Sequence, residues 1–392
     1  IELAAGADDE RSAPPIRTTF QRNLIVNRAV KDSIAVHDDI SGISFSENIG
    51  SGVQAFPSAQ GFEARSLSLV TGANGLLYPD SELADVGISK SLTVIQREDT
   101  GPSWYPKPGY EEVLDSGVIT TLSVGDSNFA DTVANSQPGD IIELEVGEYI
   151  VSKFLAISHP LTIRGIAQGN LRPVIKFERS TLFELEDGGS LKLEGITIDG
   201  SIAPDTYNNS AIRTSRYSML NNYELYLDDV HVRNLNINHS FHFLKVAMHT
   251  MAANIDIRNS VFQDITGHIF ALNRETDDLG IYNAEYVTIS QSRFTNVEGS
   301  LASVYRGGTD ESTFGPHFRL ENSVLDNVGL GNRNASQASV ALLGVQSTSI
   351  SENQFNNSAP IRVIHTVGDP VTILTDNEFS DTAAPIIQEF QR

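Results

Sequence analysis

One short pattern recurs at nearly constant spacing along most of the chain. Each copy has two aliphatic residues separated by one residue. A polar turn-forming residue follows two positions after the second aliphatic residue, and a large apolar residue lies three positions after that. The intervals between copies are 30, 34, 30, 32, 31, 30 and 24 residues, too long for hairpins, and the segments alternate with the period of β-strands. The second aliphatic residue of successive copies falls at Ile163, Leu193, Leu227, Ile257, Ile289, Leu320, Ile350 and Leu374.

This repeat predicts an all-β fold, a parallel β-helix in which each unit of about 30 residues forms one coil. The polar position should lie at a turn with left-handed backbone, where side chains can also stack. The turn column is Asp229, Asn259, Gln291, Asn322, Glu352 and Asp376. The column expected to fill the interior is Val232, Phe262, Phe294, Leu325, Phe355 and Phe379. Both columns are assigned to structure, because a solenoid must form its turns and fill its interior first.

The sequence divides into three predicted parts. Residues 117–392 should form the β-helix, with a short amphipathic helix near residues 126–135 capping its first coil. Residues 1–52 hold two copies of the pattern and are expected to be the final coils of a second β-helix that lies upstream. Residues 53–116 are rich in Gly, Ser and Pro and are expected to be an irregular connector.

Composition excludes several classes of function. The absence of cysteine rules out disulfides, zinc-thiolate sites, iron-sulfur clusters and a thiol nucleophile. With 27 Lys and Arg against 50 Asp and Glu, the formal charge of −23 disfavours nucleic acid as a partner. No apolar stretch approaches the ~20 residues that span a bilayer. Motifs for nucleotide binding and for serine or zinc hydrolysis are absent as well.

Polar residues at comparable positions of neighbouring coils are candidates for a binding site, because stacking places them ~4.8 Å apart. Lys245, Arg274 and Arg306 could form a basic stripe lined by tyrosine. The simpler explanation is that these residues form surface ion pairs with neighbouring Asp and Glu. A further possibility is catalytic: Lys245 as base and Arg274 as proton donor or carboxylate clamp. That role needs a lowered lysine pKa, which Glu275 and Asp278 would oppose.

Metal binding has weaker support. Five of the nine His lie within residues 231–268, but alternate strand residues point to opposite faces, so their spacing does not bring them to one ion. Asp277 and Asp278, and the pair Asp310 and Glu311, are rich in oxygen yet lack the pattern of an EF-hand. We therefore predict no metal site in this chain.

Two segments carry a family resemblance. Residues 277–287, which include Tyr282, and residues 305–316, which begin with Tyr305 and Arg306, resemble the C-terminal half of two-domain alginate lyases of polysaccharide lyase family six, relatives of chondroitinase B. Residues 13–25 are similar to late coils of that family's N-terminal domain. The resemblance implies a pair of right-handed parallel β-helices, degradation of alginate by β-elimination, and a secreted or periplasmic location.

In that family the base is a Lys in a Ser-x-Lys-Ser segment, the proton donor an Arg in an Arg-His-Gly segment, and Ca²⁺ is held by Asn and Glu, all in the N-terminal domain. Here Ser89-Lys90-Ser91 mimics the first segment from within the predicted connector, and the second segment is absent. The resemblance therefore implies a non-catalytic C-terminal β-helix that supports or extends the substrate groove. Ca²⁺ and the catalytic residues would belong to the upstream domain, and this chain would hold no cofactor.

Three hypotheses follow for function. As a supporting domain, the chain would have alginate, the upstream β-helix and, in a homodimer, a second copy of itself as partners. As a self-sufficient enzyme it would use Lys245 and Arg274 with Tyr305 as candidate catalytic residues. As a purely structural solenoid it would have no affinity for alginate. Substrate binding is assigned to Arg274, Tyr282, Tyr305, Arg306 and His249.

Overall fold

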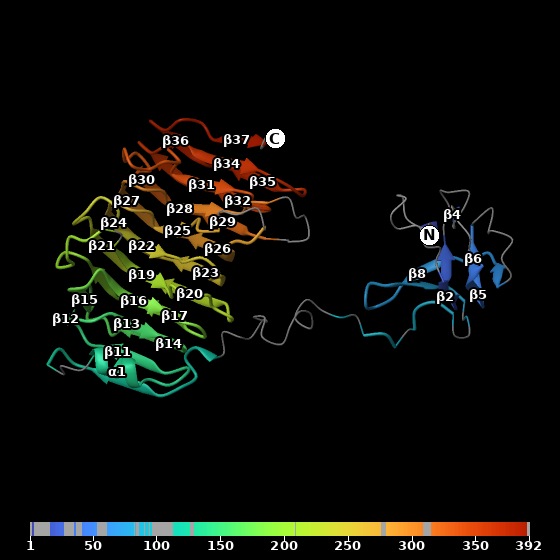
Figure 1. Cartoon of the computed structure of the whole chain (residues 1–392), viewed down its shortest axis with the longest axis horizontal. Helices are drawn as coiled ribbons and strands as arrows, with labels where there is room; N and C mark the ends of the chain where they lie inside the picture. The colour runs from blue at the N-terminus through green and yellow to red at the C-terminus, as the bar shows by residue number, and fades with distance from the viewer. Residues whose placement is uncertain are drawn as a thin grey trace. The chain divides into compact units, whose positions relative to one another are not determined.

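The chain divides into two compact units, Ile1–Thr100 and Gly101–Arg392 (Figure 1). The computed structural model describes residues 2–3, 16–26, 35–36, 41–52, 61–81, 83, 86–89, 91–93, 95, 113–125, 129–207, 209–275, 280–308 and 315–389. Lys90, Asp277, Asp278, Asp310 and Glu311, which the sequence analysis considered, lie outside the described residues.

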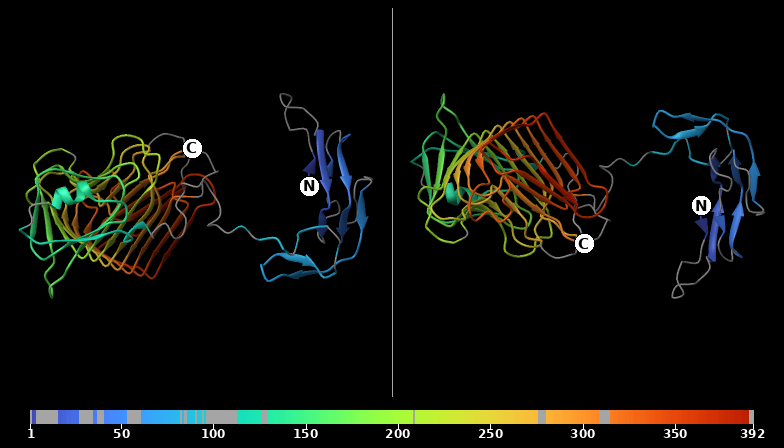
Figure 2. Two further views of the ribbon diagram at one scale, coloured as in Figure 1. Left: turned by 90° about the horizontal axis from the view of Figure 1, so that it is seen from below. Right: turned by 90° about the horizontal axis from the view of Figure 1, so that it is seen from above.

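The second unit is a parallel β-helix of three long sheets, and its coils stack side by side in both views of Figure 2. From β11 onward each coil gives one strand to each sheet, so that a strand pairs in parallel with the strand three elements later. Sheet 1 has ten described strands: β10 (Ile119–Leu122), β11 (Ile141–Leu144), β14 (Pro160–Gly165), β17 (Ser190–Glu194), β20 (Tyr223–Asp228), β23 (Ala252–Arg258), β26 (Ala284–Ser290), β29 (His317–Glu321), β32 (Ser347–Ser351) and β35 (Val371–Thr375).

Sheets 2 and 3 each have nine described strands. Sheet 2 contains β12 (Glu148–Val151), β15 (Val174–Phe177), β18 (Thr197–Asp199), β21 (His231–Leu235), β24 (Val261–Ile265), β27 (Arg293–Val297), β30 (Val324–Val328), β33 (Gln354–Asn356) and β36 (Glu378–Ser380). Sheet 3 contains β13 (Leu155–Ile157), β16 (Thr181–Leu185), β19 (Ser210–Thr214), β22 (His242–Lys245), β25 (Phe270–Leu272), β28 (Ala302–Tyr305), β31 (Val340–Leu343), β34 (Ile361–His365) and β37 (Ile386–Glu389).

The register of sheet 1 confirms the predicted repeat. Ile163 pairs with Leu193, and the column continues through every predicted position to Leu374. From Ile163 to Ile350 these side chains are at most 1% exposed. The predicted interior column of sheet 2 is also in register, and the rings of Phe262 and Phe294 stack with centroids 5.2 Å apart.

The predicted turn column has the expected backbone, with φ between 48° and 58° at all six positions. The hydrogen-bonded ladder, however, runs through the residue that follows each turn residue. Ser292 Oγ accepts the N–H of Ser260 at 3.1 Å, and Ser323 Oγ accepts the N–H of Ser292 at 3.1 Å. Buried hydroxyls therefore satisfy buried backbone donors between successive coils.

A single short helix, the only one in the described ranges, lies where the sequence predicted a cap. Helix α1 (Phe129–Asn135) buries Phe129 and Val133 at the start of the stack, opposite the end formed by β35 to β37 (Figure 1). The Phe129 ring packs edge-on against Tyr149, with centroids 6.0 Å apart. None of the described helices is long and apolar enough to cross a membrane.

The first unit has the same parallel pairing between coils, in sheets of two or three described strands. β2 (Ile16–Gln21) pairs in parallel with β5 (Gly42–Ser46), and β1 (Glu2–Leu3) with β4 (Ala35–Val36). β3 (Leu24–Val26), β6 (Asn48–Ser51) and β7 (Phe62–Ala64) form a three-stranded parallel sheet. β7 and an antiparallel hairpin, β8 (Leu69–Thr71) and β9 (Leu77–Pro79), lie in the segment expected to be irregular. The assignment of these coils to an upstream β-helix stays a prediction.

Candidate functional site

Three cations on consecutive coils gather on the outer side of sheet 3. Arg213 in β19 is in register with Lys245 in β22, and Arg274 follows β25 in the next coil. Burial lowers the pKa of Lys245, and the positive charges of Arg274 and Arg213 lower this pKa further. The three charges are therefore close enough to repel one another.

Two of these cations have no acidic partner among the described residues. Arg213 Nε donates to Glu184 Oε2 at 2.7 Å, and its guanidinium lies 5.7 Å from the centroid of the Phe154 ring. In the part of the chain that the structure describes, the side chains of Lys245 and Arg274 form neither an ion pair nor a hydrogen bond. Among the described residues, the surface ion pairs considered as the simpler explanation are thus not formed at Lys245 or Arg274, whereas Arg213 pairs with Glu184.

A lysine on sheet 1 shows the opposite arrangement. Lys192 Nζ lies 2.6 Å from Asp115 Oδ2 and 2.9 Å from Glu194 Oε1. Burial alone would lower the pKa of Lys192, but the hydrogen bonds to these two carboxylates raise this pKa overall. The pKa of Lys245 is instead lowered by burial first and by the charges of Arg274 and Arg213 second, with no hydrogen bond to a described carboxylate to raise it.

The expected stripe of Lys245, Arg274 and Arg306 is not formed as such. Arg306 is only 1% exposed, and its carbonyl oxygen lies against Gly344. Any side chain at Gly344 would lie 2.2 Å from the Arg306 carbonyl oxygen. Arg213 takes the place of Arg306 in the cluster. It lies 32 residues before Lys245, one coil length, and this spacing could have identified it from the sequence.

The other predicted binding residues divide between surface and interior. His249 is exposed, with φ of 56°, and its backbone N–H donates to Glu275 Oε1. Tyr305 ends β28 and is half-buried. The Tyr282 side chain is buried, and its hydroxyl donates to Glu285 Oε2 at 2.7 Å. His249 and Tyr305 are thus available to a ligand, whereas the Tyr282 hydroxyl already has an intramolecular partner.

The segments that carry the family resemblance meet around Glu285. Its Oε1 lies 3.9 Å from His317 Nε2, and the His317 ring stacks on Tyr286 with centroids 4.8 Å apart. A Cβ at Gly315 would come within 2.8 Å of Glu285 Oε1. A larger residue at this position would force the side chains of Glu285 and Tyr282 to move.

A histidine pair lies where two strands of sheet 3 begin: His242 is the first residue of β22, and His268 comes just before β25. The rings of His242 and His268 stack with centroids 5.4 Å apart. Their Nδ1 atoms accept the backbone N–H groups of His268 and Ser300, each at 2.9 Å, so that the proton of each neutral ring is on Nε2. Burial lowers the pKa of His242 to about 3 and that of His268 to about 4. Both rings are therefore uncharged at neutral pH.

The described residues offer no metal centre. Nowhere among them do three or more His, Asp or Glu side chains converge in a way that could hold an ion. The residues present do not form a set of oxygen ligands for Ca²⁺. The expectation that Ca²⁺ belongs to an upstream domain stays a prediction.

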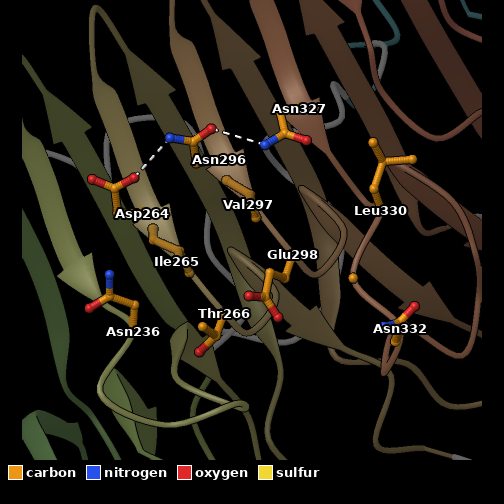
Figure 3. A pocket seen from close by; sticks show the side chains of 11 residues that line it. Asn236, Asp264, Ile265, Thr266, Asn296, Val297, Glu298, Asn327, Leu330 and Asn332 are labelled. Atoms are coloured by element: carbon orange, nitrogen blue, oxygen red, sulfur yellow. Dashed lines mark hydrogen bonds between the residues drawn. The ribbon is translucent and has the colours of Figure 1, made fainter.

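A polar hollow of about 410 Å³ lies where strands of sheet 2 end (Figure 3). Asn327 donates to Asn296 at 3.0 Å, and Asn296 donates to Asp264 at 2.9 Å (Figure 3). These three residues have φ between 53° and 59° and form a second turn column, which the sequence analysis missed despite its coil-length spacing. The charged lining residues are Asp264 and Glu298, and none is a cation. The hollow would repel a polyanion, so we assign it to turn structure.

Comparison with known proteins relates the chain to one group of enzymes. The sequence matches no protein-family profile and no curated protein. Two solved structures are similar to it: the PL6 family alginate lyase AlyGC and an arginine-to-alanine mutant of the same enzyme, each 44% identical with a TM-score of 0.73. The similarity covers 100% of this chain and 54% of each of those chains, so this chain spans about half the length of these relatives. By sequence identity and by fold, the chain belongs with the PL6 family alginate lyases.

Proposed function

We propose that this chain is the polymer-binding β-helix of an alginate lyase, and that the cations on sheet 3 bind the carboxylates of the polymer. Every residue of alginate is a uronate and carries a carboxylate. The observation that carries the proposal is that Lys245 and Arg274 are positive charges without an acidic partner among the described residues of a chain whose formal charge is −23. Charge-assisted hydrogen bonds to carboxylates are among the stronger polar contacts in proteins.

The exposed residues around this pair supply the remaining contacts. The Arg274 guanidinium can bind a carboxylate with two parallel hydrogen bonds, and the half-buried Lys245 ammonium acts as a point charge. His249 and Tyr305 can hydrogen-bond to sugar hydroxyls at the edge of the cluster. The base, the proton donor and Ca²⁺ are assigned to an upstream domain, because the family's two catalytic segments are absent from the coils of this chain.

A location outside the cytoplasm, in the periplasm or the medium, belongs to the same proposal. Alginate is a long polyanion that does not cross membranes, so a lyase must meet it there. The upstream β-helix and a second copy of the chain are proposed as protein partners.

A second candidate function makes Lys245 itself the base. The lowered pKa of Lys245, caused by burial and by its Arg neighbours, is the property that such a base requires. Neutral Lys245 would take the C5 proton, the electrons would form the C4=C5 double bond, and the C4–O bond would break with a proton passing to the departing oxygen. Glu275 was expected to oppose this shift, but the pKa of Lys245 is lowered overall. Asp278 lies outside the described residues.

One experiment separates these functions. The purified chain is mixed with alginate and Ca²⁺, the ultraviolet absorbance of new C4=C5 bonds is followed, and binding is measured by electrophoresis through alginate-containing gels. We expect retarded migration and a flat absorbance trace. A rising trace that Lys245→Ala abolishes would replace the binding role by the catalytic one. Migration that alginate leaves unchanged would contradict both functions and favour a structural solenoid.

Matched variants identify the binding surface. Lys245→Ala and Arg274→Ala should each weaken retardation, because each removes a cation without an acidic partner. Lys192→Ala removes the same charge from the same β-helix, but at a position already paired with Asp115 and Glu194, and should migrate like the parent chain. Equal loss in all three variants would show that retardation reports net charge only.

A further inference from the structure

A chain of buried polar side chains lies on the coils that carry the three cations. Thr214 directly follows Arg213, and Thr250, Glu275 and Asn283 come from the next two coils. All four side chains are at most 3% exposed. The expected stacking of hydrophobic columns does not explain them, because hydroxyl, amide and carboxyl groups replace apolar side chains at these positions.

The two threonines join the coil of Arg213 to that of Lys245. Thr214 Oγ1 accepts the Ala247 N–H at 2.8 Å and lies 3.1 Å from Thr250 Oγ1. Thr250 Oγ1 donates to the Ala247 carbonyl oxygen at 2.8 Å. Since the Thr250 proton is used there, Thr214 donates to Thr250, and every hydroxyl proton in this pair has a defined acceptor.

Asn283 joins the coil of Lys245 to that of Arg274. Its Nδ2 donates to the Thr250 carbonyl at 2.9 Å and the Ala247 carbonyl at 3.2 Å. Its Oδ1 accepts the backbone N–H of Arg274 at 3.0 Å. The amide therefore fixes the backbone of Arg274 relative to the loop that follows Lys245.

Glu275 closes the same connection. Its Oε1 accepts the His249 N–H and lies 3.3 Å from Asn283 Nδ2. Its Oε2 is buried and has no hydrogen-bond partner among the described residues. The loop that presents Arg274 thus contains a buried carboxylate, which favours the presence of positive charge nearby.

We propose that Thr214, Thr250, Asn283 and Glu275 are positioning residues that hold Lys245 and Arg274 at coil spacing beside Arg213, so that Lys245 and Arg274 bind carboxylates on successive residues of one uronate chain. This inference rests on the proposed function and deepens it. The hydrogen bonds of this network tie the loops of three successive coils together, and coils repeat every ~4.8 Å, close to the length of one sugar unit along a polyuronate. The bound chain runs along the axis of the β-helix.

The arrangement selects polymer over monomer. Once one carboxylate is bound, the next is held near a second cation at high effective concentration. Affinity therefore rises with the length of the oligosaccharide until two uronates occupy Lys245 and Arg274. A loosely held cluster would bind single carboxylates but gain less from each added residue.

The test measures the affinity of the whole chain for alginate oligosaccharides of one to six residues by calorimetry. In the parent chain we expect affinity to rise up to the dimer and then to level off. Thr250→Val keeps the shape of the side chain and removes its hydroxyl, and should weaken dimer binding about fivefold, the value of one exposed ion pair, with little change for the monomer. Thr250→Ser keeps the hydroxyl and should restore the parent's dependence on length.

Asn283→Ala gives an independent reading of the same connection, and circular dichroism reports whether each variant is folded. A purely structural role would lower the unfolding temperature of Thr250→Val and leave its length dependence like that of the parent, which would overturn the inference. Length-independent binding by the parent chain would overturn it too. If the parent chain binds no oligosaccharide at all, the proposed function fails as well. Binding without length dependence contradicts the inference alone, so the two failures are distinguished.

Discussion

The two units use the same local pattern, but only one of them buries it. Phe20 and Phe45 pair in parallel and stack at 5.4 Å in the first unit, as Phe262 and Phe294 do at 5.2 Å in the second. The first pair is half-buried, whereas the second pair is 0% exposed. The pattern therefore sets strand and turn locally, while burial depends on the number of stacked coils.

The hydrogen-bonded ladder beside the turns is the same in both units, unlike the burial of the aromatic residues. Asn48 Oδ1 accepts the Asn23 N–H and Asn48 Nδ2 donates to the Phe20 carbonyl, each at 2.9 Å. Asn353 makes the equivalent bonds to Ser323 and to the Leu320 carbonyl, at 2.9 and 3.0 Å. An Asn in the ladder thus makes two bonds to the preceding coil, whereas Ser292 donates its hydroxyl proton within its own coil.

The largest expected effect tests the contrast in burial. Phe262→Ala should destabilise the second unit by about 4 kcal/mol, because it leaves a cavity in a closed core. Phe20→Ala should cost the first unit much less, since its ring already contacts solvent. Denaturant unfolding followed separately for each unit, by fluorescent labels placed on each, measures both. Equal losses would show that the first unit encloses its aromatic stack as fully as the second.

Acid should destabilise the second unit through its histidine pair. Burial lowers the pKa values of His242 and His268 to about 3 and about 4, so below pH 6.5 the unfolded chain binds protons that the folded chain does not. Stability is therefore lost as the pH falls from about 6.5 toward 4, by up to about 1.4 kcal/mol per pH unit for each histidine. His268→Asn keeps an acceptor for the Ser300 N–H and should flatten the profile measured by urea unfolding. An unchanged profile in this variant would contradict the assignment.

The repeat made most of the architecture predictable, because each coil has aliphatic, turn-forming and large apolar residues at the same positions. The site was less predictable. Arg306 was expected at the surface, but it is buried directly after β28, and Arg213 lies in the cluster instead. Loops between sheets 3 and 1 differ in length and have no period, so the sequence does not indicate which of their polar residues face solvent. The polar network beneath the cations has no periodic signal either.

A smaller effect tests whether the ladder is independent of burial. Asn353→Ser keeps the acceptor for the Ser323 N–H but loses the bond to the Leu320 carbonyl, and should cost about 1 kcal/mol. Asn48→Ser loses the equivalent bond to the Phe20 carbonyl, and its unit should lose a similar amount. The unfolding midpoints of the two units report the two costs. A cost confined to the second unit would mean that the ladder depends on the enclosed core after all.

The smallest effect concerns charge, and its sign matters more than its size. Lys245→Met keeps the apolar length of the side chain and removes a charge that Arg274 and Arg213 repel, so it should stabilise the second unit by less than about 1 kcal/mol. Lys192→Met breaks the pairs with Asp115 and Glu194 and should destabilise the same unit by a similarly small amount. Both shifts should shrink in high salt, because screening weakens repulsion and attraction alike. Stability changes of opposite sign in the two variants would show that the cation cluster on sheet 3 destabilises the β-helix. Such a cost is expected where residues are retained for binding and not for stability. Destabilisation by Lys245→Met would mean instead that Lys245 has a stabilising partner within the protein, which would contradict its proposed role in binding an external carboxylate.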